Sequence, residues 1–242
     1  MEGIYSAGMM IALTDLTDPK NEVEFYNWYK EIKIPEIESL GFIRNTRRFE
    51  NVLSNTPTYR GRPKYLALWP IILEDIEEAH KEIKKKSRQV VSERSATVSP
   101  DEIVEYPTFA YVRMVDTLYR RIGPEFRTDR TGRKISGVHL VLCFPTDPAR
   151  EEEFNQWLNE KHVPDILSLG VYDTAYRYKI LYPNDRLPFR PYYANIYETS
   201  SDPLEALKRY TDCRAKWLED KVWVELFGVY WSGSFRQIYP PR

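Results

Sequence analysis

The sequence contains little of what most recognisable functional motifs are built from. Its 242 residues include two cysteines, three histidines and ten glycines. Cys143 and Cys213 are too few for a disulfide framework, and no Cys/His spacing is typical of a metal site. Neither a P-loop nor a GxGxxG motif occurs, which argues against a nucleotide cofactor. We therefore expect chemistry that needs neither a metal nor any other cofactor.

An excess of charge of one sign is also absent. The 35 Lys and Arg residues nearly balance the 36 Asp and Glu residues, which gives a net charge of −1. This balance removes the usual electrostatic argument for nucleic acid or an anionic membrane as the main partner. The apolar run Met9–Leu13 is far too short for a signal peptide or a membrane span, so we expect a cytoplasmic location.

Aromatic residues, in contrast, are abundant. They make up 14% of the chain, with 18 Tyr, 10 Phe and 6 Trp. Aromatic side chains commonly form the walls of small-molecule cavities. The composition therefore favours a small, aromatic molecule as the partner of this protein.

The second half of the sequence repeats the first at a shift of 129 residues (137 − 8). The segment that begins GMMIALTDLTDPK at Gly8 aligns without a gap with the segment that begins GVHLVLCFPTDPA at Gly137. Identical pairs include Thr17/Thr146, Asp18/Asp147, Pro19/Pro148, Phe25/Phe154, Trp28/Trp157, Glu31/Glu160, Pro35/Pro164 and Gly41/Gly170. Two copies with so long a period do not fit a solenoid and indicate a duplicated domain. We predict repeats over residues 1–119 and 137–242, joined by a basic connector at residues 120–136.

Each repeat is predicted to have the order strand–helix–strand–strand–helix–strand. Asp18-Pro19 and Asp147-Pro148 mark helix starts, with Asp as N-cap and Pro at the first helical position. Pro164 leaves the second of these helices near its end, and Gly170 provides a left-handed stop. The order is ferredoxin-like, an antiparallel sheet with helices on one face. The predicted fold class is α+β, with two βαββαβ repeats whose sheets face each other to form an α/β barrel.

A short motif in the second repeat resembles the dimeric α/β-barrel superfamily, in particular its EthD-like branch. The motif consists of Phe154, Trp157, His162, Val163, Pro164, Asp165 and Gly170. Members of that superfamily usually pair two ferredoxin-like chains, so the resemblance implies a barrel formed within this single chain, with a homodimer left open. It implies a fold rather than a reaction, because the superfamily contains cyclases, isomerases, cofactor-free oxygenases and haem enzymes. Lys33 replaces His162 in the first repeat.

Histidine is the residue type best suited to acid/base chemistry near neutral pH. His80 lies in a charged helical segment and is expected at the surface. His139 in a strand and His162 near the end of the following antiparallel helix should lie towards the same end of the repeat. We propose both as catalytic residues. The alternatives are that His139 is a hydrogen-bonded core residue and that His162 is a helix-end cation that complements the helix dipole.

Strand alternation assigns faces to the residues of the first strand of each repeat. Val138, Leu140 and Leu142 are uniformly apolar and should pack under the helices. His139 and the residues of its row would then face the space between the two sheets. Substrate-binding candidates are Tyr178, Arg177, Tyr176, Cys143 and Met10. Each has a simpler alternative role: packing for the tyrosines, pairing with a carboxylate for Arg177, and a small buried apolar residue for Cys143.

The preferred hypothesis is a cofactor-independent cyclase, isomerase or lyase that acts on a small aromatic or polyketide-like molecule. A shaped aromatic cavity would select a substrate conformer, and the histidines would move a proton. One working site is expected, built mainly from the second repeat, because Met10 and Lys33 replace His139 and His162 in the first. The alternatives are a cofactor-free oxygenase of phenols, a haem enzyme with an axial histidine and a non-catalytic binder.

Overall fold

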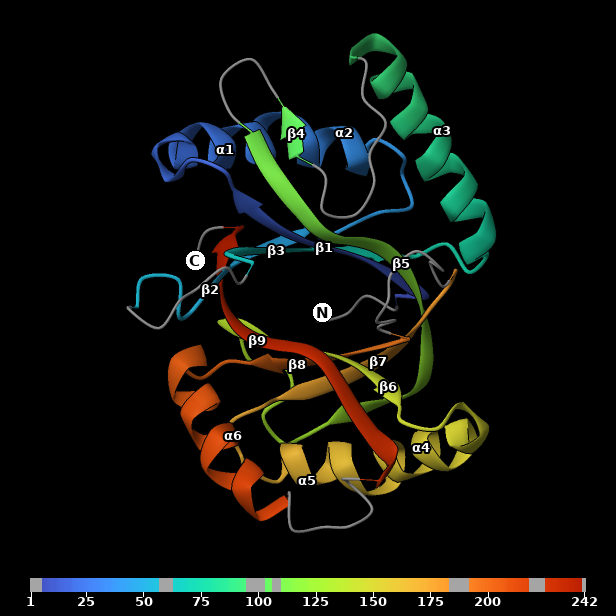
Figure 1. Cartoon of the computed structure of the whole chain (residues 1–242), viewed down its shortest axis with the longest axis vertical. Coiled ribbons are helices and arrows are strands. Elements are labelled where there is room, and N and C mark those ends of the chain that lie inside the picture. Colours follow the sequence, from blue (N-terminus) through green and yellow to red (C-terminus); the bar gives the residue numbers. More distant parts are fainter. Residues whose placement is uncertain are drawn as a thin grey trace. The chain divides into compact units, whose positions relative to one another are not determined.

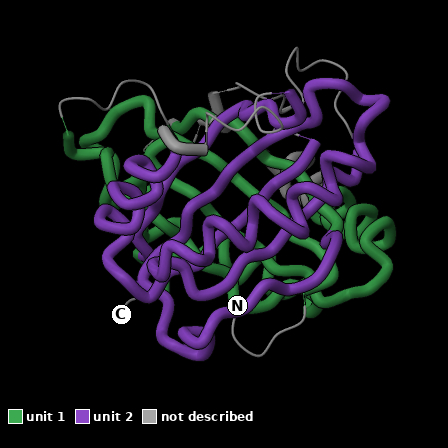
Figure 2. The backbone as a smooth tube through the Cα atoms, turned by 90° about the horizontal axis from the view of Figure 1, so that it is seen from below, with its two compact units in different colours: residues 1–120, 238–242 green, residues 121–237 purple. Residues whose placement is uncertain are grey.

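The protein is described by a computed structural model that covers residues 6–56, 63–94, 103–105, 110–182, 192–217 and 225–240. The chain divides into two compact units. Unit 1 comprises residues 1–120 and 238–242, and unit 2 comprises residues 121–237 (Figure 2). Strands pair antiparallel within each unit, and the helices of the unit lie on one face of these strands (Figure 1).

Unit 1 contains the strands and helices of the first predicted repeat. Its sheet has the order β4-β5-β1-β3-β2. The elements are β1 (Gly8–Leu16), the 3₁₀ turn η1 (Pro19–Asn21), α1 (Glu22–Trp28), the π-helical turn η2 (Tyr29–Lys33), α2 (Ile34–Glu38), β2 (Arg47–Asn51), β3 (Tyr65–Ile71), α3 (Ile76–Arg94), β4 (Ile103–Glu105) and β5 (Ala110–Arg127). β5 continues across the boundary between the units.

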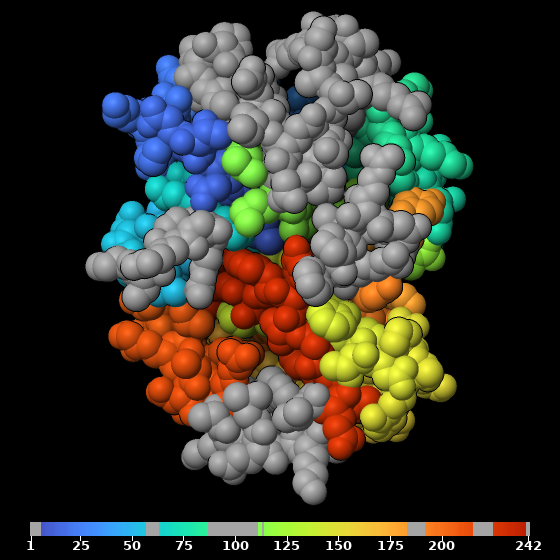
Figure 3. All heavy atoms as spheres, in the orientation of Figure 1, coloured from blue at the N-terminus to red at the C-terminus, as the bar shows by residue number. Residues whose placement is uncertain are grey.

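Unit 2 contains the same succession of elements. Its strands have the order β9-β6-β8-β7-β5, with β5 next to β7. The elements are β6 (Gly137–Pro145), the 3₁₀ turn η3 (Pro148–Arg150), α4 (Glu151–Trp157), the π-helical turn η4 (Leu158–His162), α5 (Val163–Leu167), β7 (Thr174–Ile180), β8 (Tyr193–Thr199), α6 (Pro203–Trp217) and β9 (Phe227–Tyr239). β9 reaches the surface in the view of Figure 3, with Val229 and Tyr230 more than a third exposed, whereas Ser234 and Phe235 are buried.

The fold class predicted from the sequence is confirmed: the chain has an α+β fold of the α/β-barrel type, with the ferredoxin-like order in each unit. Every element from β1 to α2 recurs in unit 2 with its bounds shifted by 129 residues. The predicted caps are present, because the Asp18 carboxylate accepts from the Lys20 N–H at 3.0 Å and the Asp147 carboxylate from the Ala149 N–H at 2.9 Å. Gly170 has the predicted positive φ of +69°.

The helical segment of unit 2 extends further past Pro164 than predicted. After α4 the chain forms the π-helical turn η4 and then α5, in which Pro164 lies in the first turn. Proline has no N–H to donate, and its ring needs space beside the carbonyl four residues earlier. The wider π-helical turn provides that space, and such turns often occur at functional sites. Unit 1 has the same arrangement with η2 and Pro35.

Part of the predicted connector is a strand. Residues 120–127 form the last part of β5, and Ile122 and Phe126 on this strand pack against the core of unit 2. Glu125 pairs with Arg127 at 2.9 Å, which neutralises part of the basic run. The basic residues of this segment predicted a solvated linker, but Ile122 and Phe126 make it part of a packed strand.

Candidate functional site

His139 faces the helices of unit 2, which corrects the face predicted from strand alternation. Its row includes Val141 and Cys143, which belong to one buried cluster with Phe154 of α4 and Tyr210 of α6. A side chain at Gly137, in the same row, would collide with Pro203 at the start of α6. Val138, Leu140 and Leu142 lie on the opposite face and are also fully buried. The alternation of side chains along a strand separates two rows but does not show which row faces the helices. Hydrophobicity could not decide this, because both rows are buried.

Four aromatic rings meet on this side of the sheet, and we call them the ring cluster. The centroid of the His139 ring lies 4.6 Å from that of Tyr210, 6.2 Å from that of Tyr172 and 6.3 Å from that of Tyr197. The rings of Tyr172 and Tyr197 lie 5.6 Å apart. Nδ1 of His139 is 2.8 Å from Oγ of Ser234, its partner residue on β9. The ring cluster thus draws on β6, β8, α6 and the segment before β7.

Three polar atoms of the ring cluster are buried without a hydrogen-bond partner in the described part of the chain: Nε2 of His139 and the hydroxyl oxygens of Tyr172 and Tyr197. A buried polar group that lacks a partner costs about 1–3 kcal/mol, and native proteins retain few of them. The ring cluster, with one such atom on the histidine and two on the tyrosines, is therefore the candidate functional site.

Burial also sets the protonation states in the ring cluster. It lowers the pKa of His139 to about 3, and the positive charge of Arg214 adds to the effect, so the imidazole is neutral at pH 7. Burial raises the pKa of Tyr172 and Tyr197 above the ordinary value, so both phenols keep their protons. The ring cluster thus holds a neutral imidazole beside two hydroxyl donors.

The equivalent strand row of unit 1 also faces the helices. Met10 is buried and lies in the same row of β1 as Gly8. A side chain at Gly8 would collide with Ile76 at the start of α3. Met10 therefore occupies the helix side of unit 1, as His139 does in unit 2.

The described residues of unit 1 nevertheless do not repeat the ring cluster. Met10 pairs with Trp69 across β1 and β3 as His139 pairs with Tyr197 across β6 and β8. Tyr172 corresponds, at the shift of 129, to Ile43. Neither a thioether nor an aliphatic side chain transfers protons, so the polar chemistry of these positions is confined to unit 2.

His162 lies in a different group of rings. Its ring stacks on that of Trp157 at 4.8 Å with an interplanar angle of 10°, and the Phe227 ring lies 5.1 Å away. The side chain is buried, and burial lowers its pKa to about 3, with Arg177 and Lys161 contributing. Such a buried, stacked ring favours a neutral imidazole over the alternative of a helix-end cation. The structure places both histidines on the helix side of the sheet but in separate ring groups.

Arg177 also points to the helix side, where asparagines bind it. Its guanidinium donates to Oδ1 of Asn155 at 2.7 Å, to Oδ1 of Asn159 at 2.5 Å and to Oδ1 of Asn195 at 3.3 Å. Asn195 in turn donates to Sγ of Cys143 at 3.5 Å. Burial raises the pKa of Cys143 to about 12, so this residue is a thiol rather than a nucleophilic thiolate. The predicted carboxylate partner of Arg177 is replaced by amide oxygens.

Tyr176 and Tyr178 alternate with Arg177 along β7 and therefore lie on the other face of the sheet. The hydroxyl of Tyr176 donates to Glu125 of β5 at 3.0 Å, and Tyr178 is fully buried. Of the predicted substrate-binding residues, Arg177 and Cys143 share the helix side with the two histidines. Tyr176 and Tyr178 do not, and Met10 belongs to unit 1.

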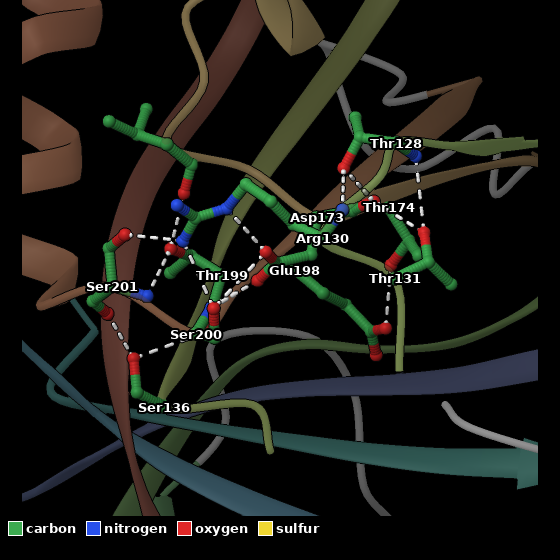
Figure 4. Close-up of polar contacts among 11 residues, drawn as sticks. Thr128, Arg130, Thr131, Ser136, Asp173, Thr174, Glu198, Thr199, Ser200 and Ser201 are labelled. Carbon is green, nitrogen blue, oxygen red and sulfur yellow. Dashed lines mark hydrogen bonds and ion pairs between the residues drawn. The ribbon is translucent and has the colours of Figure 1, made fainter. Parts of the chain in front are cut away.

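A polar network fixes the chain next to two tyrosines of the ring cluster (Figure 4). Asp173, which follows Tyr172, accepts from Nε of Arg130 at 2.7 Å and from Oγ of Ser200 at 3.1 Å. Glu198, which follows Tyr197, accepts from Oγ1 of Thr174 at 2.8 Å. Both carboxylates are fully buried. Buried and hydrogen-bonded neighbours of this kind hold the adjacent rings in one position.

Sequence reasoning missed Tyr210, Ser234 and Arg214. Tyr210 lies on the buried face of α6 with Pro203 and Ala206, at spacings of three and four residues that mark a core-facing stripe. That periodicity was available in the sequence. Ser234 could not be found in this way, because its role depends on which residue of β9 pairs with His139.

Comparisons with known proteins give the fold but no family. A family model described as "Domain of unknown function (DUF4286)" matches residues 141–228, little more than a third of the chain. No curated protein matches the sequence.

Solved structures match nearly the whole chain at low identity. An anthrone oxidase-like protein is 12% identical with a TM-score of 0.55, and the match covers 97% of this chain and 94% of that protein. The peroxidase DyPB from Rhodococcus jostii RHA1 is 9% identical with a TM-score of 0.58, over 96% and 93% of the two chains. A dye-decolorizing peroxidase from Bacteroides thetaiotaomicron VPI-5482 is 8% identical with a TM-score of 0.56, over 97% and 93%. The chain thus shares its fold with these α/β-barrel proteins.

Variants of the Rhodococcus peroxidase have been solved in complex with haem, which raises the question of whether the described histidines of this chain suit that role. An axial ligand needs a ring nitrogen that faces a space as wide as the macrocycle. Nδ1 of His139 is shared with Ser234, and three tyrosine rings surround its imidazole. The His162 ring stacks on Trp157 with the tilted ring of Phe227 beside it, and His80 lies on the charged helix α3. The described residues do not fit haem.

The described residues also contain no cluster of three or more His, Cys, Asp or Glu side chains that could hold a metal ion. In the same part of the chain, no helix is long and apolar enough to cross a membrane.

Proposed function

We propose that this protein is an enzyme that acts on a small aromatic or polyketide-like molecule and needs no cofactor for its chemistry. The reaction is a cyclisation, isomerisation or elimination in which one proton moves. The observation that carries the proposal is the ring cluster of unit 2, in which Nε2 of His139 and two tyrosine hydroxyls are buried without partners among the described residues. A ligand with a ketone or phenol oxygen would provide the missing partners.

His139 is the acid/base group in this proposal. With its Nδ1–H donated to Ser234, Nε2 carries a lone pair and accepts a proton from the substrate carbon next to a carbonyl. The electron pair of the broken C–H bond moves onto the carbonyl oxygen, which becomes an enolate. The imidazolium then returns the proton to a different atom, so the enzyme ends in its starting state.

Tyr172 and Tyr197 stabilise the enolate in the proposed reaction. Their phenols keep their protons at neutral pH and each can donate one hydrogen bond to the developing negative charge. In a buried site such donors are worth more than in water, because no solvent competes for the oxygen. The low pKa of His139 makes it a weak base until this anion forms beside it, which favours the charged pair over an isolated imidazolium.

His162 and Arg177 keep the roles predicted for them, as a second acid/base group and an orienting group. The supporting observation is that both lie on the same helix side as the ring cluster. We further propose that the chain is a tandem duplication of the EthD-like branch, that the barrel forms within one chain, and that the enzyme is cytoplasmic. The common 129-residue shift of the elements supports the duplication.

A cofactor-free oxygenase that acts on a phenol is the second candidate function. The same neutral imidazole and two hydroxyl donors suit the removal of a phenol proton and the binding of the resulting phenolate. The two candidates differ in one measurable quantity, the consumption of oxygen during turnover.

The experiment has two steps. Native mass spectrometry of the purified protein identifies any small molecule that co-purifies, and a panel of hydroxylated aromatic ketones is then incubated with the enzyme in an oxygen electrode and followed by mass spectrometry. Product of unchanged mass, or product that has lost water, without oxygen uptake supports the cyclase, isomerase or lyase. Oxygen uptake supports the oxygenase, and binding without turnover contradicts both. A Soret band with stoichiometric iron would overturn the cofactor-free proposal.

A further inference from the structure

Arg48 of unit 1 is buried in a setting that lacks a hydrogen-bond acceptor. Its side chain is 1% exposed, and Nε, Nη1 and Nη2 have no hydrogen-bond partner among the described residues. Aromatic rings surround the guanidinium: Cζ lies 3.7 Å from the ring centroid of Tyr29, 5.2 Å from that of Phe25 and 5.4 Å from that of Tyr65. The rings attract the charge through their faces, but they accept none of its N–H bonds.

Arg177 is the matched case in unit 2. Arg48 pairs with Ala67 across the strands, whereas Arg177 pairs with Asn195, which accepts from its Nε. At the shift of 129, Asn155 and Asn159 are replaced in unit 1 by Tyr26 and Lys30. All three side-chain acceptors of Arg177 are therefore missing around Arg48. Unit 1 therefore keeps the arginine but lacks the asparagines that accept its hydrogen bonds in unit 2.

A buried cation without an acceptor is strongly unfavourable, because it has lost its water and gained no partner. Burial lowers the pKa of Arg48 to about 10, so the group stays charged at neutral pH. The carboxylate of Glu22 is engaged elsewhere, since it accepts from the Tyr65 hydroxyl at 2.6 Å and from Lys64 at 2.8 Å. The arrangement calls for an anion from outside unit 1.

We propose that Arg48 and the rings around it form a binding site in unit 1 for a small organic carboxylate. A carboxylate matches the planar fork of the guanidinium and can accept two of its N–H groups at once. The flat body of an aromatic acid would pack against Phe25, Tyr29 and Tyr65, whose rings already line the group. Tyr26 is the partly exposed ring of this set, with its centroid 5.9 Å from Cζ, and so marks the side from which a ligand enters.

The site is distinct from the ring cluster of unit 2 and does not depend on the proposed reaction. It gives unit 1 a function of its own, in which a carboxylate-bearing molecule is bound without being transformed. The surroundings of Arg48 contain no imidazole among the described residues, so they offer no acid/base group that titrates near neutral pH.

Benzoate is the probe for the test, with phosphate and chloride as comparison anions at equal ionic strength. Isothermal titration and thermal unfolding are measured for the wild type, Arg48→Met and the matched control Arg177→Met. For the wild type, we expect saturable benzoate binding and a rise in Tm of about 5 °C or more at 100 times Kd. Arg48→Met should lose both effects, whereas Arg177→Met should keep the binding. Phosphate and chloride should bind more weakly than benzoate.

The proposal is overturned if benzoate gives no saturable heat with the wild type, or if Arg48→Met binds it with unchanged affinity. Stronger binding of phosphate than of benzoate would also overturn it, because the proposed ligand is a carboxylate. Arg48→Lys is the control for a loss of binding that is caused by misfolding of Arg48→Met. It keeps the charge but not the fork, so it should fold and should bind benzoate at least about tenfold more weakly than the wild type; wild-type affinity in this variant also contradicts the proposal.

Discussion

The two units have the same elements at the same spacing but differ in what the helix side of the sheet carries. In unit 2 the residues include His139, three tyrosines and an arginine bound by asparagines. In unit 1 the corresponding strand positions carry Met10 and Trp69, and Arg48 lacks acceptors among the described residues. Both units keep the helix caps and the π-helical turn, so we infer that these features belong to the shared scaffold. What differs between the units is a guide to function.

The largest expected effect is a difference in turnover between variants of His139 and of Met10. His139→Ala should lower turnover by about 10²–10⁴-fold, the usual contribution of an acid/base group. Met10→Ala should leave turnover within about tenfold, because the thioether moves no proton. Rates are measured on the substrate found with the panel, with circular dichroism to confirm folding. If both variants lose activity equally, the comparison between the units has no bearing on catalysis.

The second effect is a difference in unfolding free energy between variants of Arg177 and of Arg48. Arg177→Met leaves three asparagine side chains without their donor, which should cost about 2–4 kcal/mol of unfolding free energy. Arg48→Met removes a cation that has no acceptor among the described residues, so in carboxylate-free buffer the change should be near zero or stabilising. Urea unfolding of the two variants gives both values. A large loss in Arg48→Met would show that this guanidinium has a partner in the protein.

The third effect concerns pH. The folded-state pKa of both His139 and His162 is about 3, below the ordinary value of 6.5, so the unfolded chain binds more protons between these values. Stability is therefore complete above pH 6.5 and falls as the pH is lowered towards 3. Between about pH 7.5 and pH 5, each histidine should cost about 2 kcal/mol.

His162→Phe should remove about half of that pH dependence, because the phenylalanine does not titrate and keeps the stack on Trp157. Urea unfolding at several pH values measures the slope. A slope that is unchanged in His162→Phe would mean that the ring is protonated or exposed in the folded protein.

The smallest effect tests the likeness of the units rather than their difference. Asp18→Ala and Asp147→Ala each remove a carboxylate that caps the same 3₁₀ turn. Each should cost about 1 kcal/mol, and the two losses should agree within experimental error. Unequal losses would show that the matching sequences do not have matching energetic roles.

The fold could be predicted from the sequence because its determinants are local. The Asp-Pro caps and Gly170 each specify a helix start or a helix end without reference to distant residues. The repeat then supplied each feature a second time within one chain. The π-helical turn before Pro164 was missed, because a proline in a helix predicts a break or a kink more directly than a widened turn.

The candidate site was predicted only in part. His139 was among the predicted catalytic residues, but the face of the sheet predicted for it was wrong. The direction of a strand row depends on which of two buried faces meets the helices, which is a tertiary property. The asparagine partners of Arg177 were also out of reach, because they come from the helical segment of α4 and η4 and from the neighbouring strand.

The central claim is that a small molecule binds among the rings of His139, Tyr172 and Tyr197 in unit 2. The most direct test is a crystal structure of the protein with the molecule that co-purifies with it or, if none does, with the panel compound that it converts fastest. The account predicts an oxygen atom of that molecule within about 3.2 Å of Nε2 of His139 and within the same distance of a hydroxyl of Tyr172 or Tyr197. A converted molecule bound elsewhere, with these three atoms still unpartnered, would contradict it.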